Sequence, residues 1–184
     1  MTMENPSLDT FIADIRAAWG PLTSDLVADY RMRAAALLAA APSEPWLAAL
    51  LRDRPANAEL HRDPEFGFML LAHAEQAGLY RPPHDHGRSW VLYAIQEGEI
   101  EMGSYARVED GWDGVRLVER DRTVLRAGDV RAYLPGDIHD TRCLTPTALL
   151  FRFTERDLKA EDRPDHRITR YVDVDGQWMP GPQR

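Results

Sequence analysis

Two histidines lie one residue apart in the segment RPPHDHGRSW, residues 81–90. The two prolines before them fix φ and favour an extended chain, so His84 should follow a stiff, extended stretch. Side chains two residues apart in an extended chain point to the same face, which places His84 and His86 side by side and turns Asp85 away. Two imidazoles at this spacing can share one metal ion, although such pairs also arise by chance on solvated strands.

His139 is the best candidate for a third ligand. It follows the segment RAGDVRAYLPGDI, which reads as a turn at Gly128, a strand, and a second tight turn at Pro135 and Gly136. We expect His84, His86 and His139 to bind one divalent ion. The other histidines have different surroundings, since His61 precedes a strand, His73 lies in an apolar run and His166 lies in the polar tail.

Short strands are the elements that would position these histidines. After Pro55 the chain consists of short alternating or apolar runs, separated by the turn segments EDGWDG, RAGD and LPGD. The runs are FGFMLLAHA, WVLYAIQEG, EIEMGSYARV, VRLVER, TVLRAGDVRAYL and ALLFRFT. Such regular spacing predicts a sandwich or barrel. Closure of a barrel can bring His139 beside the other two histidines.

The N-terminal part of the chain has the periodicity of helices. Apolar residues recur at the spacing of one helical face: Leu8, Phe11, Ile12, Ile15 and Trp19. We place Ser7 as the N-cap of this helix and expect it to end at Gly20 and Pro21. A second helix is expected over residues 25–41 and a third around WLAALLRD. The expected organisation is helices packing on a barrel (1–55), the barrel with the metal site (56–158) and a C-terminal tail (159–184) with a strand at RYVDVDG.

Composition limits the classes of partner. The chain has 184 residues, 44% hydrophobic and 28% charged, which is typical of one soluble globular domain. Its net charge of −8 argues against nucleic acid or an anionic membrane as partner. No apolar run approaches the ~20 residues that span a bilayer, and the start MTMENPSLDT lacks the order of a secretory signal. With Cys143 as the single cysteine, we expect a cytoplasmic protein; its oligomeric state stays open, a homodimer being one possibility.

The two histidine motifs resemble those of the cupin superfamily. The first is HDHGRSWVLYAIQEG, and the second runs from Gly128 through Pro135 and Gly136 to His139. No glutamate follows His86 within five residues, which makes the site similar to that of the cysteine dioxygenase-like branch, the thiol dioxygenases; the resemblance covers about residues 60–154. It implies a mainly β fold, a cupin double-stranded β-helix (jelly-roll) barrel behind an N-terminal helical segment. It also implies one divalent metal ion, Fe(II) in the first place, with Ni, Mn or Zn as alternatives.

The chain departs from that branch at two places. Val91 stands where the animal enzymes carry a cysteine that is cross-linked to a tyrosine. The family's Ser-x-His-x-Tyr trio is replaced by LFRFTER, which offers Arg152, Thr154 and Arg156 near the expected places and no tyrosine. These differences leave the three histidines unchanged.

Arg62, Arg152 and Tyr93 are the candidate substrate-binding residues. Arg62 resembles the family's carboxylate-binding arginine, the alternative being a solvated loop residue. Arg152 points into the barrel if Phe151 and Phe153 pack against the outer layer, and toward solvent if they fill the barrel. An inward Arg152 would need a partner or an anionic ligand. Tyr93 could donate a hydrogen bond near the metal or be an ordinary core residue.

The leading functional hypothesis is a mononuclear non-haem iron dioxygenase that uses O2 to convert a small acidic thiol to a sulfinate. Three neutral imidazoles leave up to three positions of an octahedral Fe(II) open, enough for a bidentate substrate and dioxygen. Two alternatives remain: another metal-dependent cupin enzyme acting on a small organic acid, and a non-catalytic, metal-dependent small-molecule-binding protein. The sequence does not assign a catalytic residue.

Overall fold

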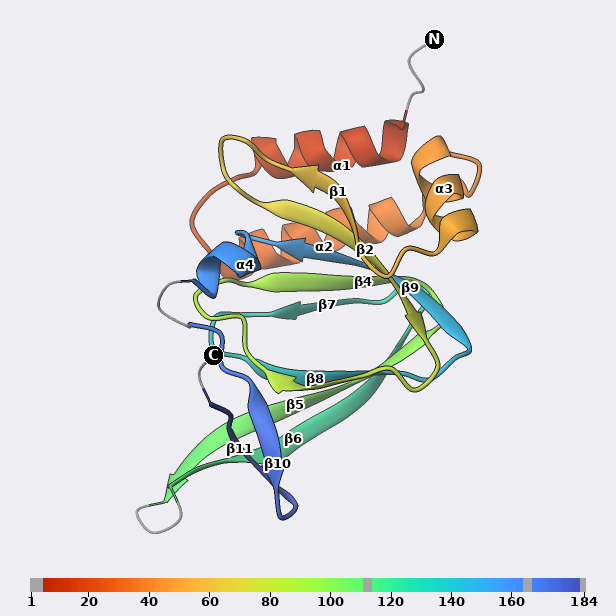
Figure 1. Ribbon diagram of the computed structural model, residues 1–184. Helices are drawn as coiled ribbons and strands as arrows, with labels where there is room; N and C mark the ends of the chain where they lie inside the picture. The colour runs from red at the N-terminus through yellow and green to blue at the C-terminus, as the bar shows by residue number, and fades with distance from the viewer. Residues whose placement is uncertain (1–4, 111–113, 164–166, 183–184) are drawn as a thin grey trace.

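A five-stranded and a four-stranded antiparallel β-sheet face each other in the computed structural model, and the N-terminal helices cover the outer side of the larger sheet (Figure 1). The structure describes residues 5–110, 114–163 and 167–182. This confirms the predicted fold class, a mainly β double-stranded β-helix (jelly-roll) barrel with an N-terminal helical segment.

The chain crosses repeatedly between the two sheets, so neighbours within a sheet are distant in sequence. The larger sheet has the order β1 (Ala58–Arg62), β2 (Met69–Gln76), β9 (Thr147–Thr154), β4 (Val91–Glu97), β7 (Val130–Tyr133). The smaller sheet has the order β3 (Tyr80–His84), β8 (Ile138–Cys143), β5 (Glu99–Asp110), β6 (Gly114–Arg126). In the larger sheet Arg152 of β9 lies opposite Leu71 of β2 on one side and Tyr93 of β4 on the other.

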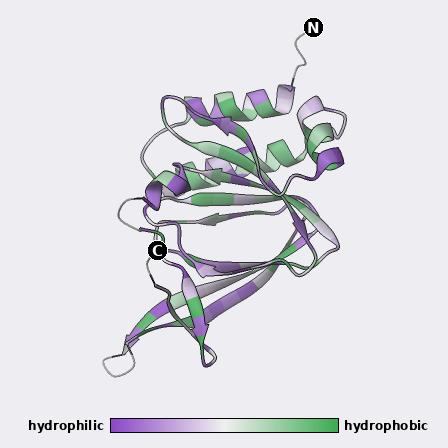
Figure 2. Ribbon diagram, in the orientation of Figure 1, coloured by the Kyte–Doolittle hydropathy of each residue, from purple (hydrophilic) through white to green (hydrophobic). Residues whose placement is uncertain are grey.

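Alternation along β4 and β9 divides the core into two layers. Phe151 and Phe153 belong to the layer between the larger sheet and the helices, where Phe153 packs edge-on against Tyr30 at 5.5 Å between ring centroids. Val91 and Leu150 face the other way, into the barrel. Hydrophobic and hydrophilic residues therefore succeed each other along the strands (Figure 2). Complete burial of one such phenylalanine contributes about 1.5–3 kcal/mol to folding.

The helices are α1 (Pro6–Ala17), α2 (Ser24–Leu38) and α3 (Pro45–Asp53). The prediction that Ser7 caps the first helix is wrong. Proline suits the first helical position because its missing N–H has no helical partner there, so α1 begins at Pro6 with Asn5 as the N-cap. The Ser7 hydroxyl instead donates to the Glu44 carboxylate at 2.6 Å. The second helix is also shorter than the predicted range 25–41 and carries a side-chain cap from Thr23, whose Oγ1 accepts from the Leu26 amide.

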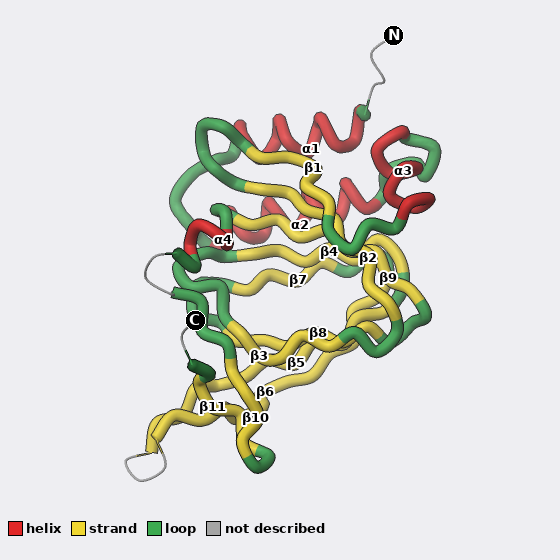
Figure 3. Tube along the Cα trace, viewed as in Figure 1, coloured by secondary structure: helices red, strands yellow, loops and turns green. Residues whose placement is uncertain are grey.

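The C-terminal part of the chain folds back onto the barrel. It contains α4 (Leu158–Glu161) and a hairpin of β10 (Tyr171–Val174) and β11 (Gln177–Pro180) (Figure 3). The hairpin contacts β3 and β6 of the smaller sheet, with Tyr171 buried in a cluster with Tyr105 and Ile138. The strand expected at RYVDVDG corresponds to β10, whereas His166, placed in the tail from the sequence, lies outside the described residues.

Within the described ranges, none of the helices has the length and apolar character needed to cross a membrane.

Candidate metal centre

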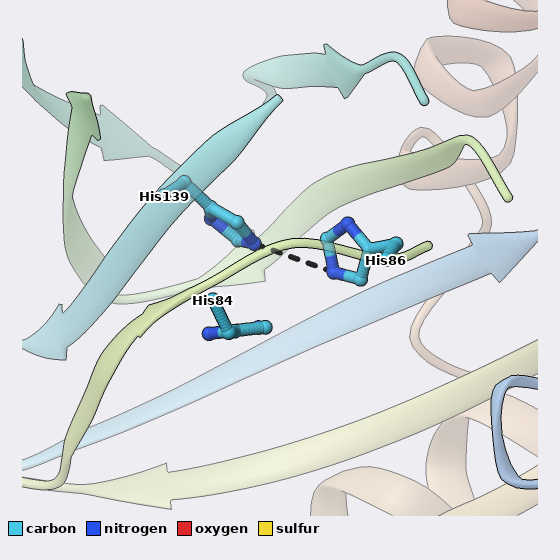
Figure 4. A group of neighbouring side chains, drawn as sticks. All are labelled: His84, His86 and His139. Carbon is cyan, nitrogen blue, oxygen red and sulfur yellow. Dashed lines mark hydrogen bonds between the residues drawn. The ribbon is translucent and has the colours of Figure 1, made fainter. Parts of the chain in front are cut away.

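The smaller sheet brings the three predicted histidines together. His84 is the last residue of β3, and it lies directly opposite His139 in the antiparallel pairing of β3 with β8. His86 lies two residues further on, in the loop between β3 and β4. The rings converge from these two adjacent chain segments, as Figure 4 shows. A one-residue change of register in this ladder would point His139 to the opposite face.

The geometry of the group suits a single metal ion. One ligand atom from each histidine lies within 4.8 Å of those of the other two. The Nε2 atoms of His86 and His139 are 3.4 Å apart, and the ring of His84 lies 4.7 Å from that of His139 between centroids. Nitrogen ligands of one tetrahedral or octahedral ion occupy corners at comparable separations, since Zn–N bonds are about 2.0–2.1 Å long.

The three rings lie in surroundings that keep them neutral, which is the form that binds metals. His139 is fully buried and His86 is 1% exposed. Burial, strengthened by the neighbouring imidazoles, lowers the pKa of His86 to about 2 and that of His139 well below its usual value. Burial also lowers the pKa of His84, against the opposing effect of a hydrogen bond to the Pro82 carbonyl.

The Nδ1 atoms of the three histidines differ in their hydrogen bonding. His84 Nδ1 lies 2.8 Å from the Pro82 carbonyl oxygen, which makes it the protonated nitrogen and leaves Nε2 free. Within the described residues, Nδ1 of His86 and of His139 has no hydrogen-bond partner. An outer partner fixes the tautomer and orientation of a metal-binding ring, and the structure provides one for His84. The ring of His139 is instead stacked on Tyr133, with 4.0 Å between centroids.

Tyr93 reaches the histidine group from the opposite sheet. Its hydroxyl oxygen lies 3.4 Å from His86 Nε2, and its ring centroid lies 5.2 Å from that of His139. The residue is 6% exposed, and burial raises the pKa of its hydroxyl, against an opposing contribution from Arg152. A protonated hydroxyl at this place can donate a hydrogen bond beside the three imidazoles.

Arg152 lies on the barrel side of β9. Phe151 and Phe153 pack against the helices, so the alternation of the strand turns Arg152 inward. Its charge adds to burial in lowering the pKa of His84, of His86 and of His139. Within the described part of the chain, its Nε has no hydrogen-bond partner and no carboxylate forms an ion pair with it, while its guanidinium interacts with the Tyr93 hydroxyl. An inward guanidinium without a carboxylate is suited to an anionic ligand.

Arg62 is the last residue of β1. Its side chain is 45% exposed, and its guanidinium forms ion pairs with Glu59 at 2.9 Å and with Asp157 at 2.8 Å. It lines a small pocket of about 80 Å³ together with Arg152, Thr154 and others. Two carboxylates already occupy its donors, so a substrate carboxylate would have to displace at least one of them.

Two buried polar residues on the inner face of β2 were not identified from the sequence as part of the interior. His73 is 8% exposed, with Nδ1 3.2 Å from the Ala56 carbonyl oxygen. Glu75 is 3% exposed and accepts a hydrogen bond from Arg81. The available signal was alternation, because Leu71, His73 and Glu75 are two residues apart on one strand. His73 and Glu75 therefore add two buried polar side chains to the barrel interior.

No family model matches the chain, and the comparison with curated proteins finds no match. Among solved structures the chain is similar to KdgF from Halomonas sp., with 17% identity, coverage of 53% of this chain and 74% of that chain, and a TM-score of 0.42. It is also similar to the cupin domain of Schizosaccharomyces pombe Cnp3, with 15% identity, coverage of 58% and 67%, and a TM-score of 0.44. An oxalate oxidase has 20% identity, coverage of 55% and 51%, and a TM-score of 0.42.

The topology and the site together define the class of protein. The chain is a double-stranded β-helix domain, which is the fold of cupin domains. Its own three-histidine group could hold a metal ion.

Proposed function

We propose that this protein is a mononuclear iron-dependent dioxygenase that converts a small thiol bearing an acidic group to the sulfinate. The overall reaction is balanced as RSH + O2 → RSO2H, with both oxygen atoms transferred to sulfur. The observation that carries the proposal is a group of three converging neutral imidazoles, without a carboxylate ligand, beside an inward arginine. Bound Fe(II) would supply the redox chemistry with dioxygen and favour the thiolate form of the substrate.

The residues around the histidines have separate tasks in this proposal. Arg152 binds the substrate's acidic group by charge-assisted hydrogen bonds, which fixes where the thiol lies. Tyr93 donates a hydrogen bond from its hydroxyl near the reacting sulfur, since this hydroxyl lies beside His86 Nε2. The apolar wall formed by Val91, Ile95 and Leu150 keeps bulk water away from the site.

A second candidate is a different metal-dependent enzyme of the same fold that acts on a small organic acid. It is favoured by the composition of β9, which carries Arg152 and Thr154 and lacks the tyrosine of the thiol dioxygenases. In this case Arg152 would still bind the acid, but no sulfur chemistry would occur. A non-catalytic binding protein would use the same arginine and show no turnover at all.

Oxygen uptake by the Fe(II)-loaded protein tests the proposal. The substrates are cysteine, 3-mercaptopropionate and mercaptosuccinate, which carry carboxylates, and cysteamine, which does not. We expect uptake with at least one acidic thiol and formation of its sulfinate. No uptake with any of the four, while elemental analysis shows bound iron, excludes the dioxygenase and favours the alternatives.

Arg152→Met tests the assignment of the anion site. Loss of a charged hydrogen bond should weaken binding of an acidic ligand by about 1.5–3 kcal/mol, and metal content should not change. Arg126→Met is the matched control, because Arg126 is largely exposed and pairs with Glu99 on the smaller sheet. If Arg152→Met binds 3-mercaptopropionate as the parent does, Arg152 is not the acid-binding residue.

A further inference from the structure

The loop that carries His86 lies outside the sheet ladders of the barrel. β3 ends at His84 and β4 begins at Val91, and residues 85–90 between them form no sheet ladder. Gly87 adopts a left-handed conformation with φ of +62°. A metal ligand keeps a fixed position only when neighbouring groups hold it. At its end the barrel holds the loop through Trp90, which packs on Phe153 with 5.2 Å between ring centroids, and the part around Asp85 needs support from elsewhere in the chain.

The C-terminal segment supplies that support through Asp85. The backbone amide of Asp85 donates to the Thr169 carbonyl oxygen at 3.1 Å, and the Thr169 amide donates to Asp85 Oδ1 at 2.9 Å. The same Oδ1 accepts from the Gly87 amide at 2.9 Å. His84 also forms an antiparallel bridge with Arg170. Asp85 Oδ1 thus accepts one hydrogen bond from within the loop and one from the tail, at a position between the candidate ligands His84 and His86.

A second contact ties the other end of the loop to the segment after the barrel. The Arg88 amide donates to Glu161 Oε1 at 3.2 Å, and its guanidinium donates to the same carboxylate at 2.8 and 3.1 Å. Glu161 is 5% exposed. A Cβ added to Gly87 would lie 3.1 Å from the Arg167 carbonyl oxygen, which shows how closely the loop and tail approach. The loop is therefore held by the tail on both sides of His86.

The tail is anchored independently of the loop. Tyr171 is 2% exposed and packs with Tyr105 and Ile138 on the outer face of the smaller sheet. Trp178 lies near Tyr80, with 6.4 Å between ring centroids. We expect these apolar contacts to stay in place when a single hydrogen bond between loop and tail is removed. The loop–tail link can therefore be tested without unfolding the barrel.

We propose that Asp85 is a positioning residue through which the C-terminal segment fixes His84 and His86 for metal binding. Asp85 does not ligate the metal, since its side chain points away from the histidine group toward Thr169. The inference rests on the metal site of the proposed function, and it concerns metal affinity alone. Partners of this kind, which orient the ligands, typically change metal affinity by about 10–100-fold when they are removed.

Three variants separate the contributions. Asp85→Ala removes both hydrogen bonds that Oδ1 accepts, whereas Asp85→Asn keeps an acceptor oxygen at the same place. Thr169→Pro removes the N–H that donates to Asp85 and keeps the Gly87 amide as a donor to the same oxygen, because proline has no N–H. Asp173→Ala is the matched control, since Asp173 also accepts a backbone amide, that of Gly176, but in the exposed turn of the tail hairpin.

The measurement is the dissociation constant of Co2+ alone, determined by competition with a chelator, together with the visible spectrum of bound cobalt and the thermal midpoint of each apo-protein. We expect about 10–100-fold weaker binding and an altered spectrum in Asp85→Ala and Thr169→Pro. Asp85→Asn and Asp173→Ala should bind close to the parent value. Hydrogen exchange at the Gly87 amide should also become faster in Thr169→Pro.

Parent-like Co2+ affinity in Thr169→Pro overturns the proposal and reduces Asp85 to a local turn residue. Equal losses in Asp85→Ala and Asp173→Ala also overturn it, because they would indicate a general loss of stability. A parent protein that binds no Co2+ rejects the metal site itself, and this positioning role with it. Failure of the thiol oxidation assay alone leaves these results unaffected, so the two failures can be distinguished.

Discussion

Replacing Gly98 by alanine should destabilise the barrel strongly. Gly98 joins β4 of the larger sheet to β5 of the smaller one and has a φ of +83°. A Cβ at this position would lie 2.5 Å from the Thr147 carbonyl oxygen, 2.6 Å from Thr145 Oγ1 and 2.8 Å from Ala148 Cβ. The nearest of these atoms belongs to the backbone, so relief requires the start of β9 to move.

Two effects determine the magnitude. A left-handed conformation costs an L-residue about 1–2 kcal/mol relative to glycine. Forcing a methyl group into a packed site costs about 1–3 kcal/mol more. The free energy of unfolding should therefore fall by about 2–5 kcal/mol, a large part of the 5–15 kcal/mol typical of a domain. The Cβ would also disturb the Thr145 hydroxyl, which accepts from the Glu99 amide and donates to the Thr147 carbonyl.

Gly136→Ala is the matched control for this prediction. Gly136 has a similar φ of +85°, but no atom lies within 4 Å of its added Cβ. Gly136→Ala should lower the free energy of unfolding only by the cost of the left-handed backbone conformation. The effect of alanine on the unfolded chain should be the same in both variants and therefore cancel in the comparison. Urea unfolding of parent, Gly98→Ala and Gly136→Ala, followed by circular dichroism, gives the comparison. Equal losses in the two variants would refute the steric part of the reasoning.

Three further predictions follow from the site and the core. A His86→Ala, His139→Ala double variant should lose the metal, measured as metal per chain after loading, and full loading would contradict the three-histidine site. Burial, with a smaller effect of Arg152, lowers the pKa of His73 from 6.5 to about 3. Between these two pH values the unfolded chain binds more protons than the folded chain. The free energy of unfolding therefore falls as the pH decreases from 6.5 toward 3. The loss should be about 2 kcal/mol at pH 5; His73→Asn should make the pH dependence of urea unfolding shallower, and an unchanged slope would contradict the assignment. Tyr30→Phe removes the hydrogen bond to the Ile15 carbonyl at 3.1 Å and should cost about 1 kcal/mol in thermal unfolding, with no effect on metal content.

Alternation in the sequence was sufficient to predict a sandwich or barrel, whereas the jelly-roll fold was what the resemblance to the cupin superfamily implied, and His139 was selected from the turn pattern before it. Alternation was not sufficient to orient β9, because a strand pattern defines two faces and does not say which of them is inside. The packing of Phe153 against Tyr30 resolved that question and turned Arg152 into the barrel. The burial of His73 and Glu75 escaped prediction for the same reason.

Long-range contacts of single polar groups were also beyond the sequence. Asp85 was expected to point away from the histidines, but nothing in the local pattern indicated Thr169 as its partner. Ser7 was assigned as an N-cap from a local preference, whereas the Glu44 carboxylate, far along the chain, binds its hydroxyl. Such pairs depend on how separate elements pack together, which local propensity does not contain.

The position of β9 affects how the chain reaches this fold. β9 lies between β2 and β4, so Thr147–Thr154 must pair with both after most of the barrel sequence has been made. Until then β2 and β4 each present an unpaired edge, and these edges include the apolar run Met69–Ala72. Pairing between segments so far apart in sequence is slow, on the order of milliseconds to seconds in all-β domains. We therefore expect pairing of β9, the last strand of the larger sheet in the sequence, to limit the rate of folding and to set the period during which the chain is exposed to aggregation.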